Sequence, residues 1–275
     1  MKDIRDAYYL YNGEVKPVSG FDDLTLRKSP VYEVIRVTSG VPLFIGEHID
    51  RIRNSFRLCS KETPYTDEEI REEIRKLIRI NSIGEGAVKL FFIEDNGSTD
   101  LLAYSMIPYM PTQEEYEHGI RTVTMQEERS NPNAKIWSWA LRKTSVNHLK
   151  KHNAFETILV NREGCITEGS RSNIFFIRAK SVVTTPATDI LPGITRKKVM
   201  QICSNHGIPL TEKKVHLNEL TAFDAAFMSG TTRKIAPVKQ IDAIPFDPHH
   251  PELRRIMELF RKTVEEYVEK HSSIQ

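Results

Sequence analysis

Four lysines stand in one central stretch of the chain, Asn131–His152: Lys135, Lys143, Lys150 and Lys151. A lysine amine becomes a nucleophile for Schiff-base chemistry when the fold holds it rigidly and partly out of water. If the stretch is one helix, with about 100° per residue, Lys143, Lys150 and Lys151 share a polar face typical of solvent exposure. Lys135 instead follows the turn-forming run NPNA, where a strand is expected to pass into the helix. From this pattern alone, an exposed lysine at a helix start is the favoured interpretation.

A carboxylate stands out further along, because Glu168 precedes Gly169 and a serine-rich turn that leads into an apolar strand. A carboxylate at a strand end can bind a cationic or protonated ring nitrogen. The alternative is a surface acid in a turn, which is the usual place for glutamate.

Two further stretches have the character of phosphate sites. Gly193 precedes a predicted helix whose first turn, Ile194-Thr195, offers backbone N–H groups, the positive end of the helix dipole and a hydroxyl. A predicted strand runs into Gly230 and Thr231, whose amides can approach an anion closely. Each pattern is weak alone, since helix starts and tight turns are common.

The elements that must position these residues mix strands and helices throughout the chain. Hairpins are predicted at Asn12-Gly13 and Ser39-Gly40, and a capping box at Thr66 and Glu69 begins a helix. Helical spacing also marks residues 46–59, 193–207 and the C-terminal region, whereas 87–93, 120–126, 154–160, 174–177 and 225–229 have strand character. The fold class is therefore α/β, and the linker is placed at 111–119, between an N-terminal domain (1–110) and a C-terminal domain (120–275).

The composition excludes several classes of protein. Of the 275 residues, 39% are hydrophobic and 28% charged, as in soluble globular proteins. A net charge of +2 is too balanced to indicate binding to nucleic acid or an anionic membrane. Three scattered cysteines have no metal-ligand spacing and suit a reducing compartment. The polar N-terminus and the lack of a membrane-length apolar run favour a cytoplasmic protein.

Taken together and in order, the motifs resemble the class IV (fold-type IV) pyridoxal-phosphate enzymes, which include branched-chain aminotransferase, D-amino acid aminotransferase and aminodeoxychorismate lyase. The resemblance rests on YEVIRV, GVPLFIGEHIDRI, ETILVNREGCITEGSRSNIFFI, ILPGITR and FMSGTTRKIAPV. It implies a smaller N-terminal α/β domain, a larger C-terminal α/β pseudo-barrel domain with pyridoxal 5′-phosphate between them, and a homodimer.

The resemblance also implies a role for each matched residue. Arg51, from EHIDRI, would bind the cofactor phosphate, and Glu168 would pair with the protonated pyridine nitrogen. The phosphate cradle would be completed by Ile194, Thr195, Gly230 and Thr231.

The Schiff-base lysine follows from spacing within the resemblance. The run KTSVN at Lys143 is similar to the family pattern K-x-x-N, with one residue more, but Lys143 lies only 25 positions before Glu168. Lys135 lies 33 positions before Glu168, which is close to the family's spacing, and an ungapped alignment selects it. Lys135 is therefore predicted as covalent anchor and general acid/base, although the residues after it, KIWSWA, are atypical.

Substrate recognition is less defined by the sequence. Tyr32 in YEV resembles a carboxylate-binding tyrosine of the D-amino acid enzyme, and Lys89 aligns better with the lyase. Arg36 or Lys89 can bind a carboxylate by charge, with a salt-bridged strand residue as an equal alternative. The leading function is transfer of an amino group between an amino acid and a 2-oxo acid. The alternatives are a lyase that releases pyruvate from aminodeoxychorismate and a degenerate member without turnover.

Overall fold

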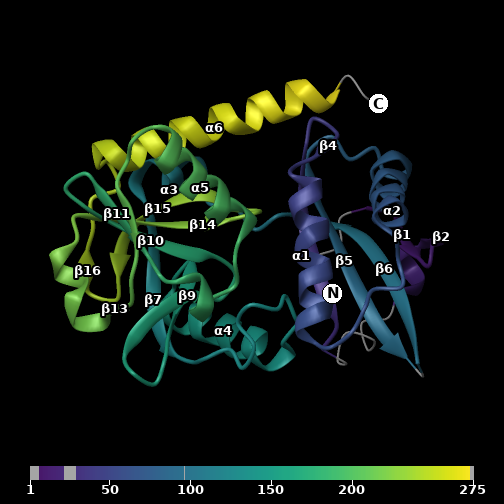
Figure 1. Ribbon diagram of the computed structural model, residues 1–275, viewed down its shortest axis with the longest axis horizontal. Coiled ribbons are helices and arrows are strands. Elements are labelled where there is room, and N and C mark those ends of the chain that lie inside the picture. The colour runs from purple at the N-terminus through teal and green to yellow at the C-terminus, as the bar shows by residue number, and fades with distance from the viewer. Residues whose placement is uncertain (1–5, 22–28, 96, 273–275) are drawn as a thin grey trace. The chain divides into compact units, whose positions relative to one another are not determined.

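The computed structural model describes residues 6–21, 29–95 and 97–272, which form two compact units (Figure 1). Unit 1 takes its described residues from Met1–Pro108, Ala134–Trp139 and Val264–Gln275, and unit 2 consists of Tyr109–Asn133 and Ala140–Thr263. The chain therefore passes between the units at more than one point. The single linker at 111–119 stays a prediction.

Unit 1 contains an antiparallel sheet in the strand order β2-β1-β6-β5-β3-β4. The turns at Asn12-Gly13 and Ser39-Gly40 are confirmed, and all four residues have positive φ, between 48° and 79°. This is the backbone that a two-residue type I′ turn requires. The strands are β1 (Tyr8–Tyr11), β2 (Glu14–Pro17), β3 (Val31–Thr38), β4 (Val41–Pro42), β5 (Gly86–Asp95) and β6 (Ser98–Met106).

Helices α1 (Ile45–Leu58) and α2 (Asp67–Ile80) cover one face of this sheet and share a core with it. The predicted capping box is confirmed, since Glu69 N donates to Oγ1 of Thr66 and Thr66 N donates to Oε2 of Glu69. The opposite face carries an aromatic core that includes Phe91, Tyr104 and Trp137. Because side chains alternate along a strand, β3 points Glu33 toward the helices and Tyr32 toward the aromatic core.

The single helix predicted over 131–152 is wrong in its first third. Helix α4 runs from Trp139 to His152, so Lys135 lies before the helix and not at its start. Instead, Ile136 forms a bridge with Val31 of β3, and Trp137 N donates to the carbonyl oxygen of Pro30 at 2.9 Å. Pairing with a distant strand outweighs the local helical pattern here. The predicted exposure of three lysines is confirmed: Lys143, Lys150 and Lys151 are all exposed.

Unit 2 is built on a mixed sheet in the order β12-β11-β10-β14-β15-β7-β8-β9-β13, with β16 paired to β15. Its apolar core joins residues of most of these strands. The strands are β7 (Ile120–Gln126), β8 (Glu156–Val160), β9 (Cys165–Gly169), β10 (Asn173–Arg178), β11 (Ser181–Thr184), β12 (Leu210–Glu212), β13 (Val215–His216), β14 (Ala225–Gly230), β15 (Lys234–Ile241) and β16 (Ile244–Pro245).

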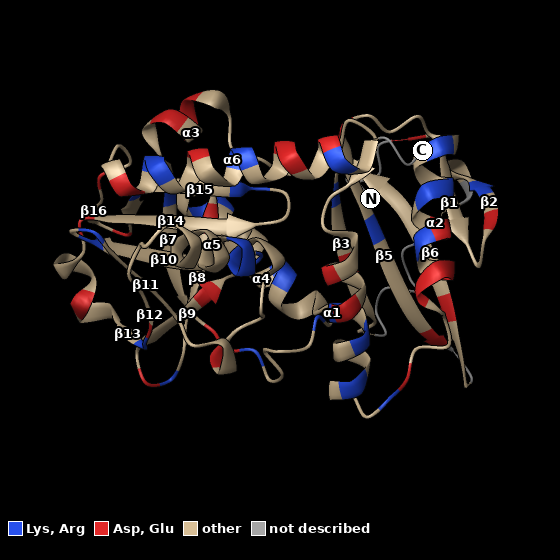
Figure 2. Cartoon of the chain, turned by 45° about the horizontal axis from the view of Figure 1, so that its top comes forward, with Lys and Arg blue, Asp and Glu red and all other residues tan. Residues whose placement is uncertain are grey.

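The remaining helices are α3 (Gln113–His118), α5 (Ile194–Asn205) and α6 (Pro251–Ser272), with 3-10 turns at Val18–Gly20, Ala187–Asp189 and Leu217–Ala222. Acidic and basic side chains are interspersed along α2 and α6 (Figure 2). Among the residues that the structure describes, no helix is both long and apolar enough to cross a membrane.

Candidate functional site

A buried cluster of charges joins strand β3 to helix α1 in unit 1. Nε and Nη2 of Arg51 donate to the two carboxylate oxygens of Glu33 at 2.9 and 2.7 Å. Nδ1 of His48 lies 3.2 Å from Oε1 of Glu33. The side chain of Glu33 has no exposed surface and Arg51 is 8% exposed. The bidentate pair fixes the plane of the Arg51 guanidinium.

The pKa values in this cluster follow from burial and from its neighbours. Burial raises the pKa of Glu33, but the charges of Arg51 and His48, with a contribution from Lys135, lower it far below its usual range. Burial lowers the pKa of His48, against the effect of Glu33. Glu33 is therefore ionised at neutral pH.

Lys135 lies beside this cluster, in a segment whose backbone is held on both sides. Lys135 N donates to Oγ of Ser55 in α1 at 3.0 Å, and Tyr32 N in β3 donates to the Lys135 carbonyl oxygen at 3.0 Å. Nζ of Lys135 is 4.5 Å from the centre of the Tyr32 ring. The residue is half-buried. It is the fixed, partly shielded amine that the chemistry requires.

The aromatic face of the unit 1 sheet holds a second lysine. Lys89 is only 2% exposed, and its Nζ lies 4.0 Å from the ring of Trp137 and 6.0 Å from that of Tyr32. Tyr32 thus contacts Lys135 and stands near Lys89, so three predicted residues lie together in unit 1. Arg36 is further along β3 and pairs with Glu85, Nη2 to Oε2, at 2.7 Å.

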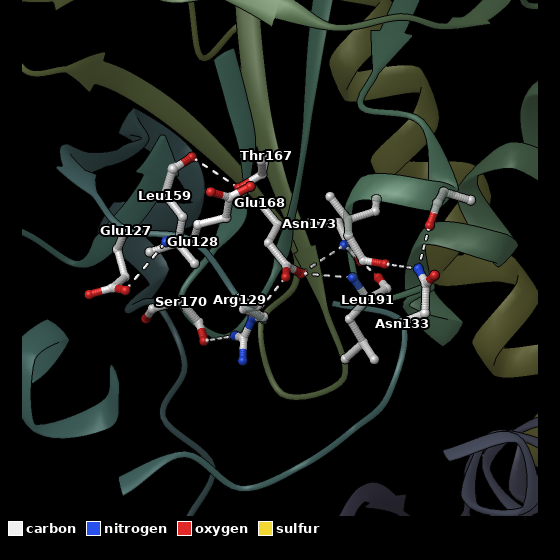
Figure 3. Close-up of polar contacts among 12 residues, drawn as sticks. Glu127, Glu128, Arg129, Asn133, Leu159, Thr167, Glu168, Ser170, Asn173 and Leu191 are labelled. Carbon is white, nitrogen blue, oxygen red and sulfur yellow. Dashed lines mark hydrogen bonds and ion pairs between the residues drawn. The ribbon is translucent and has the colours of Figure 1, made fainter. Parts of the chain in front are cut away.

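In unit 2, the carboxylate of Glu168 is 3% exposed and lies at the end of β9 (Figure 3). Nε of Arg129 donates to its Oε1 at 2.8 Å. Its Oε2 accepts from Nδ2 of Asn173 at 3.5 Å and from Leu191 N at 3.3 Å. The ion pair with Arg129 and two longer contacts fix the direction of the carboxylate, and the contact with Leu191 joins it to the segment that leads into α5.

Helix α5 begins close to that carboxylate, after Gly193. A Cβ added to Gly193 would lie 2.1 Å from Oδ1 of Asn173, so only glycine fits. The N-cap residue, Gly193, provides no side-chain cap, and the first residues of the helix, Ile194 and Thr195, are each 5% exposed. Within the described part of the chain, the first-turn N–H groups of α5 thus receive no hydrogen bond from an N-cap side chain, which leaves them suited to an anion.

The second predicted phosphate stretch is the turn between β14 and β15. Gly230 pairs with Lys234 as the last residue pair of the ladder, and Thr231 opens the turn. Lys234 has a φ of 55°, the left-handed conformation that closes such short turns. Gly230 and Thr231 are half-buried.

The sequence pattern that defines amino-transferase class IV matches residues 30–241. A D-alanine aminotransferase of Listeria monocytogenes is 31% identical over 229 residues, which cover 78% of each chain. The chain belongs to the class IV aminotransferases. The structure is similar to that of the Escherichia coli branched-chain amino acid aminotransferase, with a TM-score of 0.85, 24% identity, and coverage of 94% of this chain and 95% of that one.

A second branched-chain amino acid aminotransferase, from T.th. and solved with pyridoxamine 5′-phosphate, gives a TM-score of 0.85 at 23% identity, over 96% of this chain and 97% of that one. These similarities confirm the predicted fold-type IV architecture of a class IV aminotransferase. At identities of 24% and 23%, these structural similarities show the fold alone.

Three polar residues of this aminotransferase were missed by sequence reasoning, namely Glu33, His48 and Arg129. Glu33 and His48 lie within the matched motifs YEVIRV and EHIDRI, so their proximity to Arg51 in sequence was available as a signal. Arg129 stands 39 positions before Glu168, and no local pattern joins the two.

The donor set of this aminotransferase fits pyridoxal phosphate. Within unit 2 a buried, charge-paired carboxylate stands near a helix start without a side-chain cap. Within unit 1 a half-buried lysine stands beside a buried arginine whose guanidinium plane is fixed. The carboxylate suits the pyridine nitrogen, the arginine and the helix start suit the phosphate, and the lysine suits the aldehyde.

Proposed function

We propose that the protein is a pyridoxal-phosphate-dependent aminotransferase that moves an amino group between an amino acid and a 2-oxo acid. The observation that carries this proposal is the placement of Lys135. Its backbone is hydrogen-bonded to α1 and β3, whereas the three other lysines of the same stretch are exposed. A rigid lysine next to a phosphate-competent arginine suits a covalent cofactor anchor.

The cofactor contacts that the family resemblance implies stay our proposal. Arg51, the first turn of α5 at Ile194 and Thr195, and the turn at Gly230 and Thr231 bind the phosphate. Glu168 accepts a hydrogen bond from the protonated pyridine nitrogen. When bound, pyridoxal phosphate supplies a cationic ring that takes up electrons from the substrate's α-carbon and carries the amino group between half-reactions.

Residues of unit 1 transfer the proton and bind the substrate carboxylate. As general base, Nζ of Lys135 removes the proton from the substrate's α-carbon. As general acid, it then returns the proton to the carbon on the other side of the amino nitrogen. The Tyr32 ring, 4.5 Å from Nζ, limits the positions of the amine. Tyr32 and Lys89 are the proposed partners of a substrate carboxylate, whereas Arg36 stays a weaker candidate because Glu85 already neutralises it.

Replacement of Lys135 tests the proposal. Purified protein mixed with pyridoxal phosphate should develop the absorbance band of lysine-bound cofactor, and borohydride should fix the cofactor on Lys135 as mapped by mass spectrometry. Lys135→Ala should lose the band and lower kcat by about 10²–10⁴-fold, the usual worth of a positioned acid/base. Lys143→Ala is the matched control, since Lys143 is exposed on the same stretch. A band that survives in Lys135→Ala and disappears in Lys143→Ala would overturn the assignment.

The substrates and the assembly are also proposals. A panel of L- and D-amino acids, with pyruvate or 2-oxoglutarate as acceptor, identifies the amino donor. Conversion of none of them, with pyruvate released from aminodeoxychorismate instead, would replace the aminotransferase by the lyase. The homodimer implied by the family resemblance is tested by sedimentation of the purified protein, where a single monomeric species would contradict it. The cytoplasmic location expected from the sequence also stays a proposal.

A further inference from the structure

Two loops of unit 2 that adjoin predicted cofactor residues lie side by side. Ser170–Ser172 joins β9 to β10, and Thr231–Arg233 joins β14 to β15. Strands β10 and β14 are paired, and a Cβ added to Gly230 would lie 3.5 Å from the backbone oxygen of Arg171. Each loop thus carries one arginine, Arg171 or Arg233, close to the proposed phosphate turn.

The carboxylate next to these arginines is already well supplied with donors. Glu156 has no exposed surface. Its Oε1 accepts from Oγ of Ser170 at 2.7 Å and from Thr157 N at 3.0 Å, and its Oε2 accepts from Oγ of Ser172 at 2.9 Å. Little of its hydrogen-bonding capacity remains for an arginine.

Arg233 is buried without adequate partners. Its side chain is 2% exposed, and Nη2 lies 3.3 Å from Oε2 of Glu156. Within the part of the chain that the structure describes, neither Nη2 nor Nε makes a hydrogen bond. Burial lowers the pKa of Arg233 to about 10, although Glu156 opposes the shift. Unpaired donors on a buried cation are costly, which makes this arginine a strong recipient for an anion.

Arg171 adds a second positive charge around the same aromatic ring. Its Cζ lies 5.1 Å from the centre of the Tyr109 ring, and Cζ of Arg233 lies 5.6 Å from it. Arg171 is half-buried, so it is accessible from solvent. The ring attracts both cations but carries no net charge. Two guanidinium groups beside one carboxylate leave a positive charge without a counterion among these four residues.

We propose that Arg171, supported by Arg233, binds a carboxylate group of the acid substrate. This inference rests on the proposed aminotransferase function, whose amino acids and 2-oxo acids all carry a carboxylate. Guanidinium groups match a carboxylate through two parallel N–H···O bonds. The location also fits, because Arg171 follows Glu168 by three positions and Arg233 follows Thr231 by two. The carboxylate is either the α-carboxylate or the second carboxylate of a dicarboxylic acid.

The test is Arg171→Met in the cofactor-loaded protein, assayed with pyruvate and with 2-oxoglutarate as acceptor. We expect KM to rise about 10- to 100-fold, the equivalent of one hydrogen bond to a charged group, with kcat unchanged. A rise for both acids identifies the α-carboxylate, and a rise for 2-oxoglutarate alone identifies the second carboxylate. Arg178→Met is the charge-matched control, since Arg178 is exposed at the end of β10.

A binding measurement separates this inference from the proposed function. Calorimetric titration with propionate and glutarate, which cannot react, should show the same Arg171 dependence as KM. If the wild-type protein transfers no amino group, the function fails, and glutarate or propionate binding that requires Arg171 still supports the subsite. Equal KM values and equal affinities for both acids in wild type and Arg171→Met would overturn the inference. A fall in kcat at unchanged KM would overturn it as well.

Discussion

Unit 1 and unit 2 each bury a glutamate next to an arginine, but the two pairs are satisfied differently. Glu33 receives two hydrogen bonds from Arg51, so each charge satisfies the other. Glu156 receives its hydrogen bonds from two serines and a backbone amide, and Arg233 makes an ion pair without a hydrogen bond.

The difference shows that burial of a charge pair does not define its role. Both carboxylates have a lowered pKa, and in both cases the arginine charge works against the effect of burial. For Glu33 the arginine is the main donor, and the pair fixes the Arg51 guanidinium for the proposed phosphate contact. For Glu156, Arg233 is one neighbour among several. The N–H donors of Arg233 therefore remain available for another group. Three predictions test this contrast.

The largest expected effect is on stability in Arg51→Met. The substitution leaves Glu33 buried and charged, with the Val34 backbone N–H and His48 still close to its Oε1. The loss of one partner of a buried pair costs about 3–5 kcal/mol. Urea denaturation without added cofactor measures it, so that cofactor binding does not contribute. Arg53→Met, whose exposed side chain pairs with Asp67 on the surface, should cost less than about 1 kcal/mol. Equal losses of unfolding free energy in the two variants would mean that the buried pair stabilises the fold no more than the surface pair does.

An intermediate effect is expected on the pH dependence of stability. The pKa of Glu33 is lowered in the folded state from an ordinary value of 4.5. Its contribution is therefore complete above pH 4.5 and declines as the pH falls below that value, with a slope of up to about 1.4 kcal/mol per pH unit for one proton. Glu33→Gln should flatten this part of the stability curve, measured by thermal unfolding from pH 6 down to about pH 3. A profile as steep as that of the wild type would assign the acid sensitivity to other carboxylates.

The smallest effect is expected in Arg233→Met. Glu156 keeps its three other donors, so the free energy of unfolding should fall by less than about 1.5 kcal/mol, the net worth of one hydrogen bond. The measurement is the same urea titration as for Arg51→Met. A loss as large as that of Arg51→Met would mean that Arg233 is as essential to Glu156 as Arg51 is to Glu33.

Local signals in the sequence predicted local structure well. The turn at Asn12-Gly13 and the capping box at Thr66 depend on neighbouring residues alone, and both are confirmed. Strands β6, β9 and β15 were not predicted, because their pairing partners rather than their own patterns define them. The helix assigned to residues 131–138 failed because residues 131–134 form a turn and because Ile136 and Trp137 pair with Val31 and Pro30.

The candidate lysine was selected by order along the chain, through its spacing from Glu168. Lys135 lies beside Tyr32, and its catalytic role stays a prediction. Partners brought in by tertiary structure escaped prediction: Arg129 of Glu168, and the unsatisfied donors of Arg233. Their roles depend on burial and on competing donors, which the sequence does not encode locally.

The segment Ala134–Trp139 has a consequence for the order in which the molecule forms during translation. Val31 and its bridge partner Ile136 are separated by 105 positions, and all the strands of the unit 1 sheet precede that partner in the chain. A ribosome therefore completes the sheet-forming sequence before the segment with Lys135 emerges. Because such a distant contact has to close a long loop, it forms late. The nascent protein thus carries an ordinary solvated lysine amine until this segment docks on β3, and the proposed cofactor anchor is fixed only after the unit 1 strands have been synthesised.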